Sequence, residues 1–314
     1  METAGGKASP RAKAGAPPAV FKPQKNRKTF MTLIERQQPS HWYLRDGQPY
    51  HEVAKKDGSG MRSVTLADAR KVWAFPSVTN VLGIIAKPGL EAWKIEQGIL
   101  AALTLPRRDG EDLGLFAKRV VADMSNEVEK AADFGTAIHN ACELYAREKV
   151  VPSSEALQPY MKDWMRWFDE NVERVDCLEK VFVARDLGFA GRVDMVAKLR
   201  DTGWAVVDFK TQKIKRSAKG EPKPAFYETW PLQLAAYHYA ATLDATKPIS
   251  ALVSVVIDSA VPGPVHVKDW GEGGTWFDGY NLKVGEYLRR FTAALELWKY
   301  VKEYDPVAFR PENN

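Results

Sequence analysis

Two apolar runs within residues 187–213, LGFAGRVDMVAKLRDTGWAVVDFKTQK, constrain the fold more than any other feature of the chain. Val193–Leu199 and Trp204–Phe209 are rich in β-branched and apolar residues, and residues 200–203 between them carry a turn signal. This pattern predicts an antiparallel β-hairpin. The second strand, WAVVDFKT, is apolar apart from Asp208 and Lys210, whereas a solvated edge would alternate polar and apolar residues, so we expect a buried strand with charges at its end.

Three charged side chains meet at one end of this hairpin. Counting outward from the turn brings Asp194 opposite Asp208, with Lys210 two residues further along the same face of its strand. Neighbouring carboxylates repel each other, and a divalent cation such as Mg²⁺ or Mn²⁺ holds them ionised together. With an ammonium group beside it, such a site suits phosphodiester hydrolysis. Taken alone, an Asp-x-Lys tripeptide is equally consistent with a surface strand that carries a salt bridge.

A second cluster of functional residue types lies upstream, in residues 131–149. Apolar residues recur there at helical spacing, which places His139 and Glu143 one turn apart on another face of the predicted helix. A histidine and a carboxylate so arranged can reach one metal ion, or they are a packed histidine and a solvated charge. Gly135 lowers helix stability unless another segment approaches its backbone closely. The apolar positions are Ile138, Cys142 and Tyr145.

Two further segments follow the hairpin. Residues 231–242 predict a helix with Pro231 in its first turn, and Gln233 and Tyr237 lie one turn apart on one side of it. Their amide and phenol groups suit contacts with phosphate or a base, or the margin of a packed helix. The loop before that helix either supplies positive charge to phosphates or is a solvated basic loop. Its basic residues are Lys213, Lys215, Arg216, Lys219 and Lys223.

The order of these motifs resembles the RecB-like branch of the PD-(D/E)xK nuclease superfamily. The resemblance covers residues 75–258 and rests on GTAIH followed by an acid, on Glu179 before a strand, and on GRVD, VDFKT and QLAAY. It implies an α/β fold with a restriction-endonuclease-like core, in which helices flank a central mixed β-sheet. It also implies Mg²⁺- or Mn²⁺-dependent hydrolysis of DNA that leaves a 5′ phosphate and a 3′ hydroxyl.

Motif by motif, the resemblance implies roles for residues of this chain. The implied metal ligands are His139, Asp194 and Asp208. Lys210 positions or polarises the hydrolytic water. The implied catalytic residues are Asp194, Asp208, Lys210, Glu143 and Glu179. The implied DNA contacts are Gln233 and Tyr237, to which the basic loop adds Lys213, Lys215 and Arg216.

The cysteine content separates the chain from those relatives that carry an iron–sulfur cluster. Four thiolates close such a cluster, whereas the chain has two cysteines, Cys142 and Cys177. We therefore expect no iron–sulfur cluster, no disulfide framework and a reducing cytoplasm, that of the bacterial host if the protein is phage-encoded. No apolar run is long enough to span a membrane, and the N-terminus lacks the order of a signal peptide.

Positive charge is concentrated near the N-terminus. Residues 1–28 contain seven basic side chains and one acidic side chain, and the remaining residues contain 38 and 39. Few large apolar residues occur in this segment, so we expect residues 1–28 to be a disordered basic tail. The tail either binds nucleic acid by releasing counterions or is a solubilising leader, while a transit peptide is disfavoured by the lack of an amphipathic pattern. Residues 29–314 are then the nuclease domain, with a helical and hairpin elaboration on its N-terminal side.

By analogy with the family, we expect an exonuclease that acts on linear single-stranded or duplex DNA in recombination, repair or genome processing, with a recombinase or helicase as a possible partner. A structure-selective DNA endonuclease would use the same residues. The rival from another class is a non-catalytic DNA-binding protein on a nuclease fold. The scaffold is expected to contain a hairpin through residues 46–47, a helix capped by Ser77, a strand over 251–257 paired with 265–270, and a helix over 276–304.

Overall fold

The structure of the chain is a computed structural model that describes Met1 and residues 41–244, 247–277 and 280–308. Its helices and strands all belong to one unit, residues 37–314. The predicted basic tail and the domain boundary that follows it fall, apart from Met1, outside the described residues. Both therefore stay predictions.

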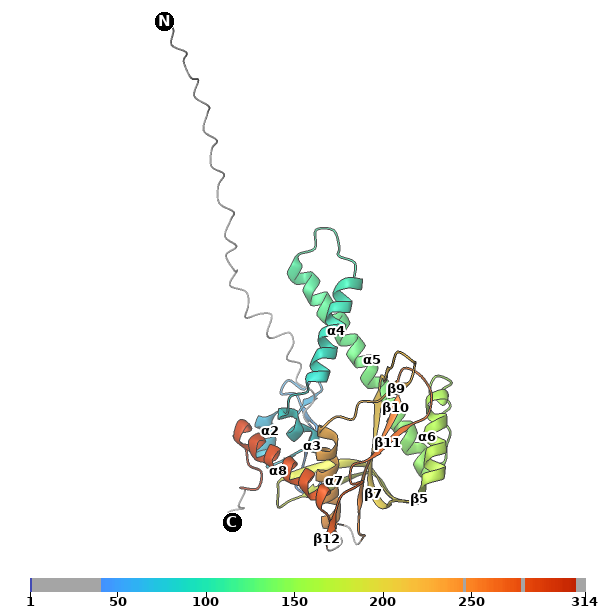
Figure 1. The fold of residues 1–314 in the computed structure, drawn as a ribbon. Helices are drawn as coiled ribbons and strands as arrows, with labels where there is room; N and C mark the ends of the chain where they lie inside the picture. Colours follow the sequence, from blue (N-terminus) through green and yellow to red (C-terminus); the bar gives the residue numbers. More distant parts are fainter. Residues whose placement is uncertain (2–40, 245–246, 278–279, 309–314) are drawn as a thin grey trace. The chain divides into compact units, whose positions relative to one another are not determined.

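A five-stranded mixed sheet forms the centre of this unit (Figure 1). Its strand order is β11-β10-β7-β6-β5, in which β7 and β10 run parallel and the other neighbours run antiparallel. The strands are β5 (Val172–Ala184), β6 (Phe189–Leu199), β7 (Gly203–Gln212), β10 (Ala251–Asp258) and β11 (His266–Asp269). The predicted α/β fold with a central mixed sheet is confirmed.

Strands β6 and β7 form the predicted hairpin. Met195 pairs with Val207 and Leu199 pairs with Gly203, whose φ of +81° suits the turn. Strand β10 is buried along its whole length, as expected for a central strand packed on both faces. Its predicted antiparallel partner is present as β11.

Helices cover both faces of the sheet. One face packs against α5 and α6, whose apolar residues share a core cluster with Val207. The other face packs against α7 and α8, which share a second cluster with Val206. Successive residues of β7 thus enter different core layers, as the alternation of a strand requires. The helices are α5 (Leu113–Glu148), α6 (Gln158–Asn171), α7 (Thr229–Asp244) and α8 (Leu282–Lys302).

Helix α5 is longer than the predicted helix over residues 131–149. It begins at Leu113, where the Asp112 side chain accepts hydrogen bonds from the first backbone amides, and it ends at Glu148. Its first half packs against α4 (Pro88–Thr104), and a Cβ atom added at Gly98 would lie 3.4 Å from Met124 Sδ. The helix is therefore longer than the segment that apolar spacing predicted, and its additional first half packs against α4.

Short elements precede the sheet. The strand pairs are β1 (Trp42–Tyr43) with β4 (Phe75–Pro76) and β2 (Glu52–Ala54) with β3 (Met61–Ser63). The helices are α2 (Leu66–Val72), α3 (Val78–Val81) and the 3₁₀ helix η1 (Leu82–Ile84). The predicted turn at residues 46–47 is present, but the strands beside it pair with β4 and β3 rather than with each other, apart from one bridge between Tyr43 and Pro49. Ser77 caps α3 as predicted, because its Oγ accepts the Asn80 amide at 3.0 Å.

The C-terminal helix begins later than predicted. Helix α8 begins at Leu282 because the Asn281 side chain accepts the backbone amides of Lys283 and Val284. The residues before it form two short strands, β12 (Trp276–Phe277) and β13 (Tyr280–Asn281). On the inner side of α8, Phe291, Leu295 and Trp298 are buried, and Tyr287 is half-buried.

Among the residues that the structure describes, no helix has the length and hydropathy that a membrane span requires.

Candidate active site

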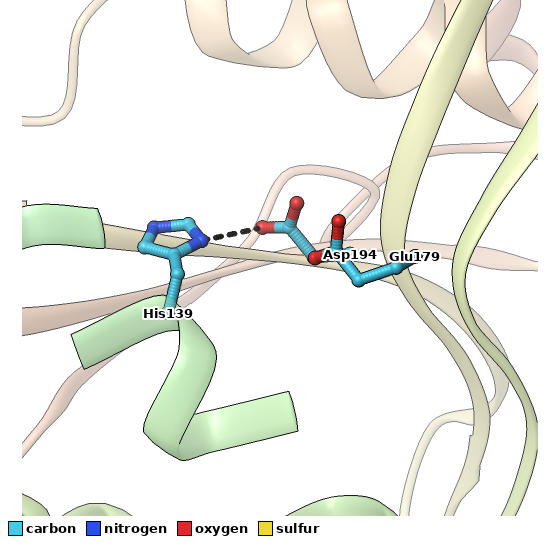
Figure 2. Close-up of side chains that lie close together, drawn as sticks. All are labelled: His139, Glu179 and Asp194. Carbon is cyan, nitrogen blue, oxygen red and sulfur yellow. Dashed lines mark ion pairs between the residues drawn. The ribbon is translucent and has the colours of Figure 1, made fainter. Parts of the chain in front are cut away.

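Three side chains of types that can ligate a metal converge beside strands β5 and β6 (Figure 2). His139 comes from α5, Glu179 from β5 and Asp194 from β6, and one ligand atom of each lies within 4.8 Å of the other two. They line an open cleft of about 380 Å³. The structure thus brings together the predicted ligands His139 and Asp194 with the predicted acid Glu179.

Asp194 occupies the point where β6 and β7 stop pairing through their backbones. The last ladder pair on this side is Met195 with Val207, so the register sets Asp194 beside Asp208, as predicted. The Asp194 carboxylate then accepts the Phe209 amide at 2.7 Å. The same oxygen lies 3.7 Å from His139 Nδ1, so the carboxylate joins the strand to the helix.

Glu179 reaches the cleft through an unusual backbone conformation. Its φ of +49° is left-handed, which costs a residue with a side chain about 1–3 kcal/mol. The pairs on either side, Leu178 with Met195 and Lys180 with Val193, place it opposite Asp194. Backbone strain thus coincides with the meeting point of the two carboxylates.

Arg192 is a cleft residue that the sequence reasoning missed. Its Nε lies 2.9 Å from Glu179 Oε2, and its side chain is 60% exposed. Arg192 and Asp194 are two residues apart on β6 and both line the cleft, so period-two alternation applied to the GRVD motif would have found it. The guanidinium brings a positive charge to a cleft that is also lined by three acids, Glu143, Glu179 and Asp194.

A second, buried part of the site contains Asp208 and Lys210. Lys210 Nζ lies 2.5 Å from Asp208 Oδ2, and Asp208 is only 2% exposed. The two groups form an ion pair, but the geometry is not that of a hydrogen bond. Oδ2 is therefore a buried oxygen without a hydrogen-bond donor. Gln233 contacts both groups at 3.4 Å, because its amide donates to Asp208 and its carbonyl accepts from Lys210. Asp208 is not part of the group that His139, Glu179 and Asp194 form.

Tyr237 supports this buried part of the site by binding Gln233. Its hydroxyl accepts the Gln233 amide at 3.0 Å, and the residue is only 6% exposed. Its ring passes directly over Gly191, where an added Cβ atom would lie 2.4 Å from Cε1. The glycine of the GRVD motif therefore makes room for the tyrosine of the QLAAY motif.

Helix α5 also approaches the sheet at a glycine. A Cβ atom added at Gly135 would lie 2.9 Å from Thr211 Oγ1 on β7, so another segment does approach this glycine closely. Thr211 lines the cleft as well, and no separate signal in the sequence predicts this role. The contact brings the turn that carries His139 against the end of β7.

Burial and mutual repulsion perturb the ionisation of these groups. Burial, with a smaller contribution from the Asp194 carboxylate, raises the pKa of Glu179 to about 7. Burial raises the pKa of Asp208 to about 6 although the Lys210 ammonium opposes it, and burial also raises the pKa of Asp194. The pKa of His139 is lowered, mainly by burial and then by Lys210, so its imidazole is neutral at pH 7. Burial thus favours protonated carboxyl groups and a neutral imidazole, and a bound cation would favour the ionised carboxylates.

The remaining predicted residues lie around this centre. Glu143 lines the cleft and pairs with Arg147 on the same helix. Lys213 is exposed, as is Lys215 at the start of a small hairpin that pairs β8 (Lys215–Arg216) with β9 (Pro222–Lys223). Arg216 is held by the buried Asp258 at 2.8 Å.

The comparisons with known proteins agree with this geometry. A model of the PD-(D/E)XK nuclease superfamily matches residues 154–263, which include Glu179, Asp194, Asp208 and Lys210, whereas His139 lies outside the match. A search of curated proteins found no match. Residues 154–263 therefore match the PD-(D/E)XK nuclease superfamily, and they contain most of the central mixed sheet together with these acids and the lysine.

Proposed function

We propose that the protein is a deoxyribonuclease that depends on a divalent metal ion, Mg²⁺ or Mn²⁺. The observation that carries the proposal is the convergence of His139, Glu179 and Asp194 in an open cleft next to the Asp208–Lys210 pair. A phosphodiester backbone requires an accessible cleft, and hydrolysis requires positive charge where the phosphate becomes more negative.

The donor set fits a divalent cation. One neutral imidazole nitrogen and two carboxylates lie within coordinating reach of each other, and Asp208 has a buried oxygen without an aligned donor. We propose His139, Glu179 and Asp194 as holders of the ion and retain Asp208 as a fourth ligand. When bound, the ion would neutralise charge on the phosphate and on these acids.

The protein's own groups then have separate tasks. Lys210 lies against Asp208 and its charge acts on His139 and Asp194, so we assign to its ammonium the tasks of orienting the attacking water and stabilising charge on the phosphate. Gln233 holds the side chains of Lys210 and Asp208 in position through hydrogen bonds, and Tyr237 in turn holds Gln233. The burial of Tyr237 supports a positioning role for the pair, while direct contact with DNA stays a prediction.

Substrate binding requires basic groups beyond the catalytic centre. We assign phosphate contacts to Arg192, which lies in the cleft, and to Lys213 and Lys215, which are exposed. Arg216 is engaged by Asp258, which supports a role in holding the small hairpin that carries Lys215. Glu143, at the cleft wall, is proposed as an auxiliary acid.

We favour an exonuclease that leaves 5′ phosphates and acts in recombination, repair or genome processing, on the basis of the motif resemblance. The test is incubation of the purified protein with end-labelled linear and closed-circular DNA, single- and double-stranded, with Mg²⁺, Mn²⁺ or EDTA. We expect metal-dependent degradation of the linear substrates only, and a loss of at least about 100-fold in Lys210→Ala.

A matched control is Lys198→Ala, since Lys198 lies on the same sheet but pairs with Glu173 away from the cleft. Cutting of circles would mean an endonuclease. Unchanged cleavage by Lys210→Ala would contradict the site, and binding without cleavage under every metal would leave the non-catalytic alternative.

A further inference from the structure

An aromatic pair lies between β9 and the first turn of α7. The rings of Tyr227 and Trp230 meet edge to face with centroids 5.3 Å apart, and the Trp230 amide donates to the Tyr227 carbonyl at 3.0 Å. Tyr227 is 43% exposed and Trp230 is half-buried. The neighbouring Phe226 packs with Trp270, so the pair has firm support on its inner side.

This aromatic pair borders the proposed catalytic lysine. Lys210 Nζ lies 5.9 Å from the centroid of the Trp230 ring. Trp230 and Gln233 are three residues apart on α7 and share a face of the helix, and Gln233 contacts the same ammonium. A nucleotide whose phosphate lies at Lys210 would therefore have its base within reach of these rings.

The start of α4 packs against the ring of Tyr227. A Cβ atom added at Gly89 would lie 3.5 Å from Tyr227 Cε1, so the tyrosine packs on a helix turn that lacks a side chain at this point. Lys87, just before this turn, is half-buried, and its pKa is lowered by burial and by the nearby ammonium groups of Lys94 and Lys210. Exposed aromatic surface thus lies among several cations.

Aromatic rings beside a cationic track are the usual means of binding single-stranded nucleic acid, because every base has a π-face and every nucleotide a phosphate. We infer that Tyr227 and Trp230 form a binding subsite for an unpaired nucleobase next to the phosphate that Lys210 addresses. The inference rests on the proposed function, since Lys210 marks the phosphate. A base within a duplex is already stacked on both faces, so the subsite selects a single strand or a frayed end.

The test measures DNA binding in EDTA, where no cleavage occurs, by anisotropy of a labelled single-stranded oligonucleotide and of the matching duplex. Tyr227→Ala is expected to weaken single-strand binding roughly 5- to 150-fold and to leave duplex binding unchanged. Tyr227→Phe keeps the ring and should bind as the wild type does. Tyr300→Ala is the matched control, because Tyr300 is 81% exposed on α8.

A second measurement locates the base. Single bases of the oligonucleotide are replaced, one at a time, by abasic nucleotides. The wild type should lose affinity at one or two positions, and Tyr227→Ala should no longer respond to the change at those positions. Equal weakening of single-strand and duplex binding, or an unchanged abasic profile in Tyr227→Ala, would overturn the subsite.

The failure of this inference is distinguishable from that of the nuclease proposal. If the wild type degrades DNA with Mg²⁺ or Mn²⁺ while Tyr227→Ala matches it in every binding assay, the subsite is refuted and the nuclease stands. If the wild type degrades no DNA but retains the Tyr227-dependent abasic profile, the nuclease proposal fails and the subsite stands.

Discussion

Replacing Gly191 with alanine tests whether the two halves of the site fit together as the structure shows. The added Cβ atom would lie 2.4 Å and 2.8 Å from two ring carbons of Tyr237, and 3.1 Å from Val78 Cγ2. The ring cannot retreat easily, because Tyr237 is buried and its hydroxyl is held by Gln233. Either the Tyr237 ring or the strand backbone at residue 191 must therefore move within a packed core.

The size of the effect follows from two opposing contributions. Overpacking of a core costs about 1–3 kcal/mol, and these contacts belong at the upper end of that range. Alanine gains roughly 0.5–1 kcal/mol over glycine inside a strand. We expect a net loss of about 2 kcal/mol in the free energy of unfolding, which lowers the melting temperature by about 4–8 °C.

Urea denaturation and thermal melts of Gly191→Ala measure this loss. The matched control is Gly83→Ala, because a Cβ atom at Gly83 has no neighbour within 4 Å. In a Tyr237→Ala background, which removes the ring, Gly191→Ala should cost much less than in the wild type, whereas Tyr237→Phe should preserve the cost. A stability within about 0.5 kcal/mol of the wild type would refute the reasoning. Cleavage should also fall, because a displaced Tyr237 releases the amide that orients Lys210.

Three further predictions concern the charges around the cleft. Glu179→Gly should be more stable than Glu179→Ala by about 1 kcal/mol in thermal melts. Both variants remove the carboxylate, but only glycine accepts a φ of +49° without strain, so equal stability would contradict the strain. In EDTA, the raised pKa values of Glu179 and Asp208 give stability that is fully present below their unfolded pKa values and is lost as the pH rises through about 6–7. Thermal melts from about pH 3.5 to 8, with Glu179→Gln as control, would show this loss, and saturating Mg²⁺ should remove it. Asp258→Asn should free Arg216 and so loosen the hairpin of β8 and β9. We expect KM for DNA to rise several-fold with a smaller change in kcat, and a change in kcat alone would contradict this role of Asp258.

The hairpin at the centre of the fold was predictable because its signals are local. β-branched runs and a turn over residues 200–203 define the strands, and counting from that turn sets Asp194 beside Asp208. The helix with Gln233 and Tyr237 was predictable for the same reason. The first residues of α5 and α8 were predicted wrongly because Asp112 and Asn281 cap these helices, and a single capping side chain is a weak signal beside an apolar period, whereas the last residues agree within two positions.

The grouping of the acids was harder to predict because it depends on contacts between distant segments. Glu179 enters the cleft through a left-handed backbone that local sequence rules do not predict for glutamate. Asp208 points to Lys210 and Gln233, so its carboxylate does not join the group with His139. The need for glycine at residue 191 becomes visible only when the Tyr237 ring is in place.

The site requires more of the chain than the segment that matches the superfamily. That segment begins at residue 154, after α5 has ended, yet α5 supplies His139 and one wall of the cleft. Two contacts fix this helix on the sheet: Gly135 packs against Thr211, and His139 faces the carboxylate that also holds the Phe209 amide. A shift of α5 would therefore disturb the same strand end that presents Asp208 and Lys210. The smallest unit able to form the complete cleft thus includes α5 together with the matched strands, and the helix is as much a part of the site as the acids themselves.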